Sequence, residues 1–309
     1  MSKFTIHHTK TNDILFHLTA ENNTFKNTLL EAINAKIDLS NADLSNNDLS
    51  EIDLNYIDLS QAKICNVDLN HSNLNGANLS NAIIRNSILI ACNLSLTDLS
   101  RADLSYSNLS NADLSYANLK NATLCYANLR GAQLNNSDLI NVNSSFANFF
   151  LANLHGSNFS HANLKNAILT EVDLSFCYLT YADLSNSNLS KSNLDHSKLN
   201  EANLTEANLN QTDLSYTDLT NANLTNTNLT AANLFGTKLN KNIYSVTGLG
   251  KYNEMVTYCF DNDMIWSKDF KGSLSEFEIK AVANYKENIL GEYLGFINYM
   301  KSLKKNNPK

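Results

Sequence analysis

Proline and charge are both scarce in this sequence. Pro308 is the single proline among 309 residues, and only 9 residues are glycine. Charged residues make up 17% of the chain, below the roughly 25% of an average soluble domain. The formal net charge of −7 is modestly acidic, so we expect no direct binding to nucleic acid and none to an anionic membrane.

Signatures of secreted, membrane-spanning and metal-binding proteins are also missing. No stretch approaches the ~18 consecutive apolar residues of a membrane span, and Met1–His8 lacks the apolar core of a secretory signal. The five cysteines are widely separated and form no CxxC pair, which argues against a disulfide framework and a zinc site. We therefore expect a cytoplasmic protein with reduced thiols.

Catalytic motifs are absent as well. The sequence contains no GxGxxG, GxxxxGK[ST], HExxH or GxSxG. The seven histidines form no ligand set, and Asp261-Asn-Asp263 lacks the remaining ligands of a calcium loop. We expect no enzyme, no cofactor and no metal site.

An uninterrupted five-residue repeat dominates the chain instead. From Leu39 to Leu239, we call every fifth residue a pentad centre. The 41 centres are 36 Leu, 2 Ile, 2 Phe and Ser144. The residue two positions before each centre is small or β-branched, and Asn47, which precedes the centre Leu49, is the sole exception. The residue directly before the centre, the pre-centre residue, is Asp or Asn in 32 of the 41 pentads.

A period of five fits neither a helix nor a continuous strand. On a helix, residues five apart differ by about 140°, so the leucines would spread around the cylinder. On a strand, an odd spacing would send alternate leucines to opposite faces. The chain must therefore turn once per pentad, with the centre and the small residue inward and the pre-centre residue outward. Periodicity alone leaves three or four sides per coil open.

The repeat resembles a known family. Ala42-Asp-Leu-Ser-Asn46, Ala112-Asp-Leu-Ser-Tyr116 and Ala222-Asn-Leu-Thr-Asn226 match the A(D/N)LXX motif of pentapeptide-repeat proteins over residues 37–241. The resemblance implies an all-β fold, a right-handed quadrilateral β-helix of about ten coils and roughly 50 Å. Aromatic residues recur at a spacing of twenty, which supports four pentads per coil: Tyr106, Tyr126, Phe146, and separately Phe176, His196, Tyr216.

Both ends depart from the repeat and read as small α+β caps. Residues 1–36 predict a hairpin of Phe4–Ile6 with Ile14–Leu18, followed by a helix over 24–35. Residues 242–309 predict a hairpin of 254–260 with 264–266, then one long helix that opens at the capping box Ser273-Leu-Ser-Glu276. The second module resembles end modules of bacterial and phage relatives. It reads either as a cap for the last coil or as a module for docking a partner or forming a homodimer.

Aromatic residues supply the candidate interaction surface. Tyr106, Tyr126 and Phe146 form a column that either only stabilises the coil or acts as a binding ridge. Near Ser144, the predicted cluster of Phe146, Phe149 and Phe150 indicates a defect that bends the rod or a recognition patch. Trp266 is the candidate in the C-terminal module.

These features favour a non-enzymatic scaffold that binds an unidentified protein partner through the solenoid surface or the C-terminal module. The alternative comes from the resemblance: some relatives mimic DNA, bind type II topoisomerases (DNA gyrase, topoisomerase IV), and inhibit them or protect them from quinolones. Residues 37–241 hold 15 Asp and 4 Glu against 7 Lys and 3 Arg, a net charge of −9. About 50 Å of B-DNA would carry about 29 negative charges. The charge therefore favours the scaffold.

Overall fold

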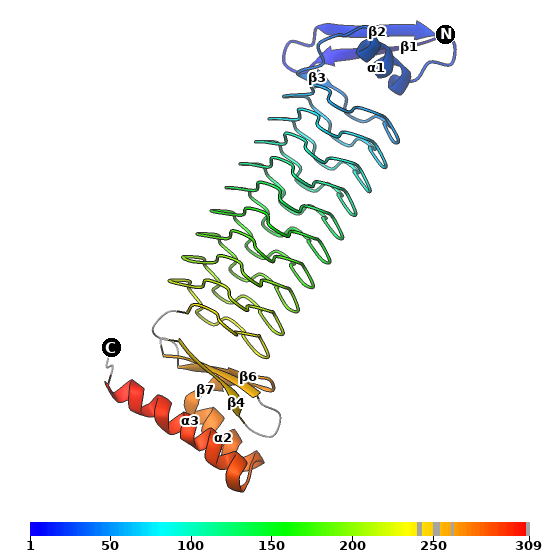
Figure 1. Cartoon of the computed structure of the whole chain (residues 1–309). Helices are drawn as coiled ribbons and strands as arrows, with labels where there is room; N and C mark the ends of the chain where they lie inside the picture. Colours follow the sequence, from blue (N-terminus) through cyan, green and yellow to red (C-terminus); the bar gives the residue numbers. More distant parts are fainter. Residues whose placement is uncertain (240–242, 250–253, 261–262, 307–309) are drawn as a thin grey trace.

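The computed structural model describes residues 1–239, 243–249, 254–260 and 263–306. The chain forms a long rod with an α+β module at each end (Figure 1). Between the modules, the repeats wind as regularly stacked coils. The two termini lie at opposite ends of the molecule.

The N-terminal module is joined to the first coil through its backbone. Strands β1 (Ser2–His8) and β2 (Ile14–Ala20) form an antiparallel hairpin, and helix α1 (Phe25–Asn34) follows. The Thr24 side chain accepts a hydrogen bond from the Asn27 backbone N–H and so caps α1. Strand β1 also pairs with β3 (Ala42–Asp43) in the first coil, so the hairpin continues the sheet of the solenoid.

Twenty residues make one coil. Parallel bridges join each pre-centre residue to the one twenty positions later, from Asp43 with Lys63 to Asp218 with Lys238. Typical bonds run from the Leu44 N–H to the Lys63 carbonyl at 2.8 Å, and from the Lys63 N–H to the Ala42 carbonyl at 2.9 Å. Each coil therefore contains four pentads, and each pentad forms one side.

The four sides can be named from one coil in the middle of the rod. Its pre-centre residues are Asp103, Asn108, Asp113 and Asn118, and each gives its name to one side. Residues that differ by a multiple of twenty lie on the same side. The corner before the Asn108 side is the Tyr106 corner, and the corner diagonally opposite is the Tyr116 corner.

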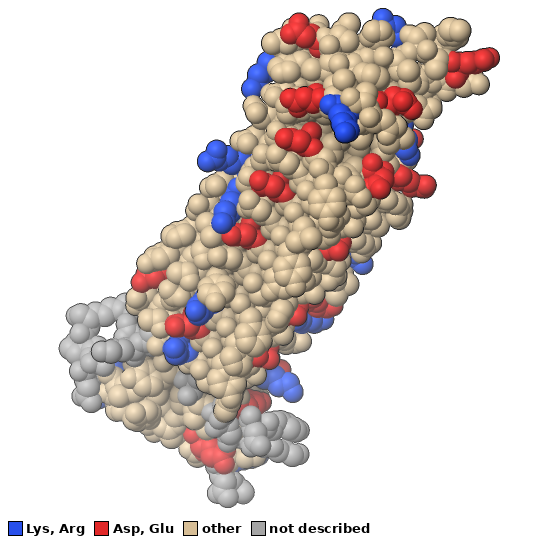
Figure 2. Space-filling view, turned by 45° about the horizontal axis from the view of Figure 1, so that its top comes forward, with Lys and Arg blue, Asp and Glu red and all other residues tan. Residues whose placement is uncertain are grey.

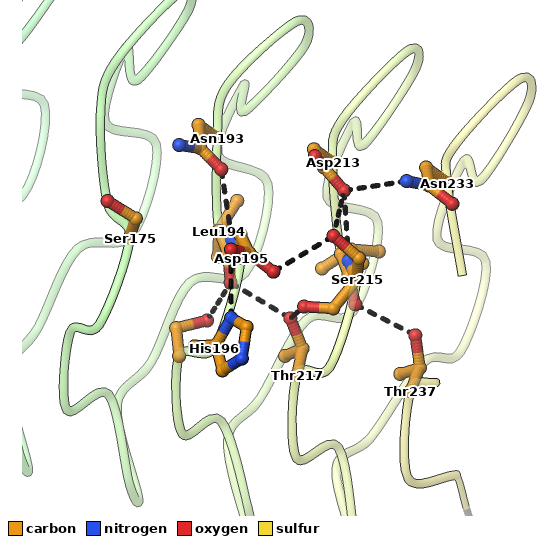
Figure 3. Close-up of polar contacts among 12 residues, drawn as sticks. Ser175, Asn193, Leu194, Asp195, His196, Asp213, Ser215, Thr217, Asn233 and Thr237 are labelled. Carbon is orange, nitrogen blue, oxygen red and sulfur yellow. Dashed lines mark hydrogen bonds and ion pairs between the residues drawn. The ribbon is translucent and has the colours of Figure 1, made fainter. Parts of the chain in front are cut away.

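The composition of the pentad explains the corners. In the Asp103 pentad, the carboxylate Oδ1 accepts the Ser105 backbone N–H at 3.0 Å, and the next residue, Tyr106, adopts a left-handed φ of 63°. Asn and Asp are the residues that make this local bond most readily. An Asn in the next coil also donates across the gap, as Asn233 does to Asp213 at 2.9 Å (Figure 3). The pre-centre residue thus fixes its own turn and ties neighbouring coils together.

The core is a continuous stack of leucines that adjusts at one coil. Ser144 is buried at a pentad centre, and its Oγ has no hydrogen-bond partner among the described residues. The same coil contains the larger centres Phe149 and Phe159, whose ring centroids lie 6.3 Å apart in a T-shaped arrangement. Pairing with the next coil continues unbroken at Asn143, and the rod does not bend there (Figure 1). The predicted bend is therefore wrong, and we infer that the two Phe side chains fill the space that Ser144 leaves.

The C-terminal module is a four-stranded antiparallel sheet covered by two helices. The strands follow the order β4-β5-β6-β7, and their bounds, with those of the helices, are β4 (Ile243–Leu249), β5 (Glu254–Cys259), β6 (Met264–Ser267), β7 (Phe270–Ser273), α2 (Leu274–Asn284) and α3 (Glu287–Asn306). The predicted capping box at Ser273 and Glu276 is present. The predicted turn at 261–263 lies partly outside the described residues.

The predicted hairpin is present as the antiparallel pair β5–β6, and strands β4 and β7 extend it into a sheet. The prediction of a single long helix is wrong, because the structure has two helices. The break falls at Tyr285, whose φ of −118° and ψ of 152° are extended. The break lets Phe277 of α2 and Tyr293 of α3 meet with ring centroids 5.8 Å apart, so both helices bury their apolar sides on the sheet.

The sheet lies between the last coil and the helices. One face contributes Ile243, Cys259 and Trp266 to the same core as the solenoid leucines. The other face joins Val256 and Ile265 to the core formed with α2 and α3. This packing covers the leucines that the last coil would otherwise expose to water.

Candidate interaction surface

The Tyr106 corner carries a stacked aromatic ladder. Tyr106 and Tyr126 stack with centroids 5.1 Å apart, and Tyr126 and Phe146 with centroids 4.8 Å apart. Their exposed fractions are 60%, 49% and 46%. Because the rings face one another along the rod, their edges and the tyrosine hydroxyls point to solvent. The ladder therefore offers an apolar ridge with hydrogen-bonding tips.

The structure separates the other predicted aromatic residues. Phe149 is a buried pentad centre and Trp266 is 1% exposed, so their assignment to a surface is wrong. Phe150 directly follows a centre and is half-buried at the opposite edge of the Asn108 side from Phe146. The predicted cluster of three Phe side chains therefore does not form.

Phe150 has a partner that the sequence analysis missed. The Arg130 guanidinium carbon lies 4.8 Å from the centre of the Phe150 ring, in a cation–π arrangement. The Arg130 side chain is exposed and has no carboxylate partner among the described residues. Arg85, in contrast, donates from Nε to Asp103 at 2.6 Å. The signal for this contact is the twenty-residue spacing of Arg130 and Phe150.

Exposed apolar residues complete this side of the rod. Ile88 and Leu151 lie on the Asn108 side and its edge, with exposed fractions of 40% and 49%. Ile88 is one of the few pre-centre residues that is neither Asp nor Asn, so the sequence alone could have indicated an exposed apolar residue at this position. We call the following set the Arg130 patch: Ile88, Tyr106, Tyr126, Arg130, Phe146, Phe150 and Leu151.

The Arg130 patch lies in an almost uncharged part of the surface. Four successive segments of the Asn108 side and its edges, 86–91, 106–111, 126–131 and 146–151, contain a single charged residue, Arg130. Between the two edges, Asn128 Nδ2 donates to Asn108 Oδ1 at 3.2 Å. The centre of the side is thus a row of amides whose hydrogen bonds are partly used within the protein.

A second ladder occupies the Tyr116 corner further along the rod. His196 stacks between Phe176 and Tyr216, with centroid distances of 5.0 and 4.8 Å. His196 Nδ1 lies 2.8 Å from Asp195, and the Ser215 hydroxyl donates to the same carboxylate at 2.9 Å (Figure 3). Burial opposes ionisation of Asp195, but these hydrogen bonds outweigh it and lower the pKa of the carboxyl. The two ladders stand on diagonally opposite corners, so they belong to separate surfaces.

Acidic residues lie mainly on the other sides and toward the N-terminal end. Figure 2 shows Asp and Glu side chains concentrated in the upper part of the visible face, with Lys and Arg among them. Four aspartates on the Asp103 and Asn118 sides form ion pairs: Asp43 with Lys63, Asp103 with Arg85, Asp138 with Lys120, and Asp218 with Lys238. These pairs interrupt any acidic stripe.

Neither a metal centre nor a membrane-spanning helix is found within the described ranges. In that part of the chain, no three His, Cys, Asp or Glu side chains gather as metal ligands. No helix there has the length and apolar character needed to cross a bilayer.

Comparison with known families identifies the repeat. The family model for pentapeptide repeats matches eight copies over residues 52–89, 92–131, 127–166, 167–205 and 202–240. Comparison with curated proteins gives no match.

Solved structures similar to the chain carry the same repeat. HetL, a pentapeptide repeat protein involved in heterocyst differentiation regulation from the cyanobacterium Nostoc sp. strain PCC 7120, is 30% identical; the alignment covers 69% of this chain and 92% of HetL, with a TM-score of 0.37. QnrB1, a plasmid-mediated fluoroquinolone resistance protein, is 20% identical over 64% of this chain and 89% of its own, with a TM-score of 0.43. Rfr23 from the cyanobacterium Cyanothece 51142 is 38% identical over 32% and 61%, with a TM-score of 0.22.

Proposed function

Because this chain belongs to the pentapeptide-repeat family, we propose that it is a non-enzymatic scaffold that binds a protein partner through its solenoid surface or its C-terminal module. The observation that carries this proposal is the Arg130 patch. Its exposed aromatic rings and its arginine are the residue types enriched at the centres of protein interfaces.

The leucine core supports the scaffold function because it stabilises the rod without help from the surface. Pentad centres from Leu44 to Leu219 are almost completely buried. Each contributes roughly 1.5–3 kcal/mol of apolar burial. The residues of the Arg130 patch are outside this core, so selection for stability alone does not require exposed rings there.

The terminal modules support a capping role. We propose that the coil is right-handed and that both modules are caps, since β1 extends the first coil and one face of the β4–β7 sheet covers the last. The second module also has a groove of about 410 Å³ between β4 and α3, lined by residues such as Val246, Phe296 and Tyr299. A homodimer through this groove is the docking alternative for the module.

One observation favours mimicry of DNA as the second candidate function. Asp48 and Asp68 occupy neighbouring coils on the Asn108 side, and Asp38 and Asp58 do so on the Asn118 side. A topoisomerase would then bind the N-terminal end of the rod. Inhibition of DNA-gyrase supercoiling by micromolar protein, or protection from a quinolone, would favour this function over the scaffold. No effect at tens of micromolar would exclude it.

Site-specific photocrosslinking tests the scaffold proposal directly. A benzophenone amino acid replaces Tyr126 in the Arg130 patch, Tyr116 on the opposite corner, or Tyr299 at the groove, and each protein is irradiated in lysate of its source cells. A specific protein adduct from Tyr126 or Tyr299, absent from Tyr116, supports the proposal. Equal labelling at all three positions, or none, contradicts it.

A further inference from the structure

We propose that the Arg130 patch binds a protein segment that carries a carboxylate group between apolar side chains. This inference rests on the proposed function and adds the chemistry of the partner. Three observations lead to it: the positive sign of the single charge in the patch, the contact of Arg130 with Phe150, and the width of the Asn108 side.

The charge of the patch is opposite to that of the rod. Residues 37–241 have a net charge of −9, yet the four patch segments carry only the positive charge of Arg130. An acidic segment is repelled by most of the solenoid and attracted at this place. This local reversal of charge determines where along the uniform rod an acidic segment binds more than it raises the affinity of that segment.

Arg130 is positioned for an external carboxylate. The Arg130 guanidinium carbon lies over the Phe150 ring, 4.8 Å from its centre, and this contact restricts the side chain before a partner arrives. On the adjoining Asp113 side, the carboxylate of Asp113 accepts the Ser115 backbone N–H at 2.9 Å and forms no ion pair with Arg130 among the described residues. A guanidinium fork can bind a carboxylate through two parallel hydrogen bonds, so the missing partner is a planar anion of this kind.

The apolar neighbours determine what surrounds that carboxylate. Tyr126 and Arg130 are four residues apart, so at most about 14 Å of extended chain separates the two edges of the side. A helix with its side chains is about 10–12 Å wide, and one segment can therefore contact both edges. The stacked ladder holds its rings in place, so little side-chain entropy is lost when apolar groups pack on it.

A peptide-display selection on the full chain tests the inference. A random 12-residue library is panned on the wild-type protein, and the selected peptides are measured against Arg130→Gln and Tyr126→Ser. Arg101→Gln is the matched control, because Arg101 is an exposed arginine at a different corner of the same rod. We expect Asp or Glu flanked by apolar residues in the selected peptides, with at least a tenfold loss of affinity in both patch variants and no change in the control.

Three outcomes of the peptide selection would overturn the inference. Selected peptides could lack acidic residues, they could bind Arg130→Gln as tightly as wild type, or the library could yield no binder. Concentration-dependent self-association that Tyr126→Ser abolishes would also overturn it, because the occupant would then be a second copy. A crosslinked partner at Tyr126 that is insensitive to Arg130→Gln would retain the proposed function and reject only the carboxylate.

Discussion

Replacing Ser144 tests whether the core of this coil is locally compensated. The repeat favours Leu at this position, and a Leu buried in an empty space would stabilise the rod by roughly 1.5–3 kcal/mol. The structure predicts the opposite sign. Phe149 and Phe159 already meet across the coil with centroids 6.3 Å apart, so Ser144→Leu adds volume to a filled core. Overpacking of this kind costs about 1–3 kcal/mol.

Removing the Ser144 hydroxyl should have the opposite effect on stability to adding a Leu side chain. Its Oγ is buried and has no hydrogen-bond partner among the described residues, while the backbone N–H donates to the Asn163 carbonyl at 2.8 Å. An unsatisfied buried polar group costs about 1–3 kcal/mol, and Ser144→Ala removes it without touching the backbone bond. We expect Ser144→Ala to stabilise this part of the rod by about 1 kcal/mol.

Hydrogen exchange of the amides between residues 144 and 164 is the suitable assay, because long repeat arrays do not always unfold in one step. Protection should fall in Ser144→Leu and rise in Ser144→Ala. In a Phe149→Leu background, Ser144→Leu should become stabilising, since the space is then free. If Ser144→Leu stabilises the otherwise unchanged protein, the compensation argument is refuted.

Three further predictions concern corners, thiols and ion pairs. Gly76→Ala should destabilise the rod by about 1 kcal/mol, because a Cβ there would lie 2.5 Å from the Tyr56 ring and Gly76 has a left-handed φ of 64°; Tyr56→Ala should remove the part of the loss that comes from the ring contact, as measured by chemical unfolding. Cys92 and Cys177 should resist iodoacetamide at pH 8 until the protein unfolds, since burial raises the pKa of each thiol to about 12; peptide mapping should find Cys65 and Cys125 modified first. Burial raises the pKa of Asp103, but hydrogen bonds from Arg85 and Ser105 outweigh it and lower the pKa below 3.8. The stability from this lowered pKa is present above pH 3.8 and lost as the pH falls through the folded value, and Arg85→Gln should weaken that acid sensitivity in unfolding curves at pH 5 and pH 3.

The sequence predicts the solenoid well because each pentad repeats the same local rule. Leu at the centre and Asp or Asn before it specify burial and turn together, and 41 copies leave little ambiguity. The same rule places Phe149 inside, so its assignment to a surface contradicted the pattern. Side membership is harder to predict, because a five-residue period does not set the number of sides. Arg130 and Phe150 become neighbours only when the coil is known to hold twenty residues.

The C-terminal module has no comparable rule. Trp266 lies in a short strand whose burial depends on the last coil beneath it, which is a tertiary contact. The helix ends at Tyr285 without a proline or glycine to mark the break. Packing of α2 and α3 on one face of the sheet overrides the continuous helical pattern of the sequence.

Because one coil is twenty residues long, two deletions can distinguish an effect on the fold from an effect on the Arg130 patch. Removing the pentad 131–135 leaves every remaining pentad intact but shifts all later residues by one side relative to Tyr126 and Arg130. Phe146 then no longer stacks on Tyr126, and Phe150 no longer lies against Arg130. Removing the coil 171–190 instead keeps every later residue on its original side and leaves the Arg130 patch whole.

Both deletion proteins should fold, because the leucine stack and the two terminal contacts are unchanged. Circular dichroism and thermal unfolding check this expectation. Binding of the peptides selected on the wild-type protein should fall at least tenfold after the pentad deletion and stay unchanged after the coil deletion. Equal binding by both proteins would mean that no surface composed from several coils is recognised, since the pentad deletion takes such a surface apart while it preserves each repeat.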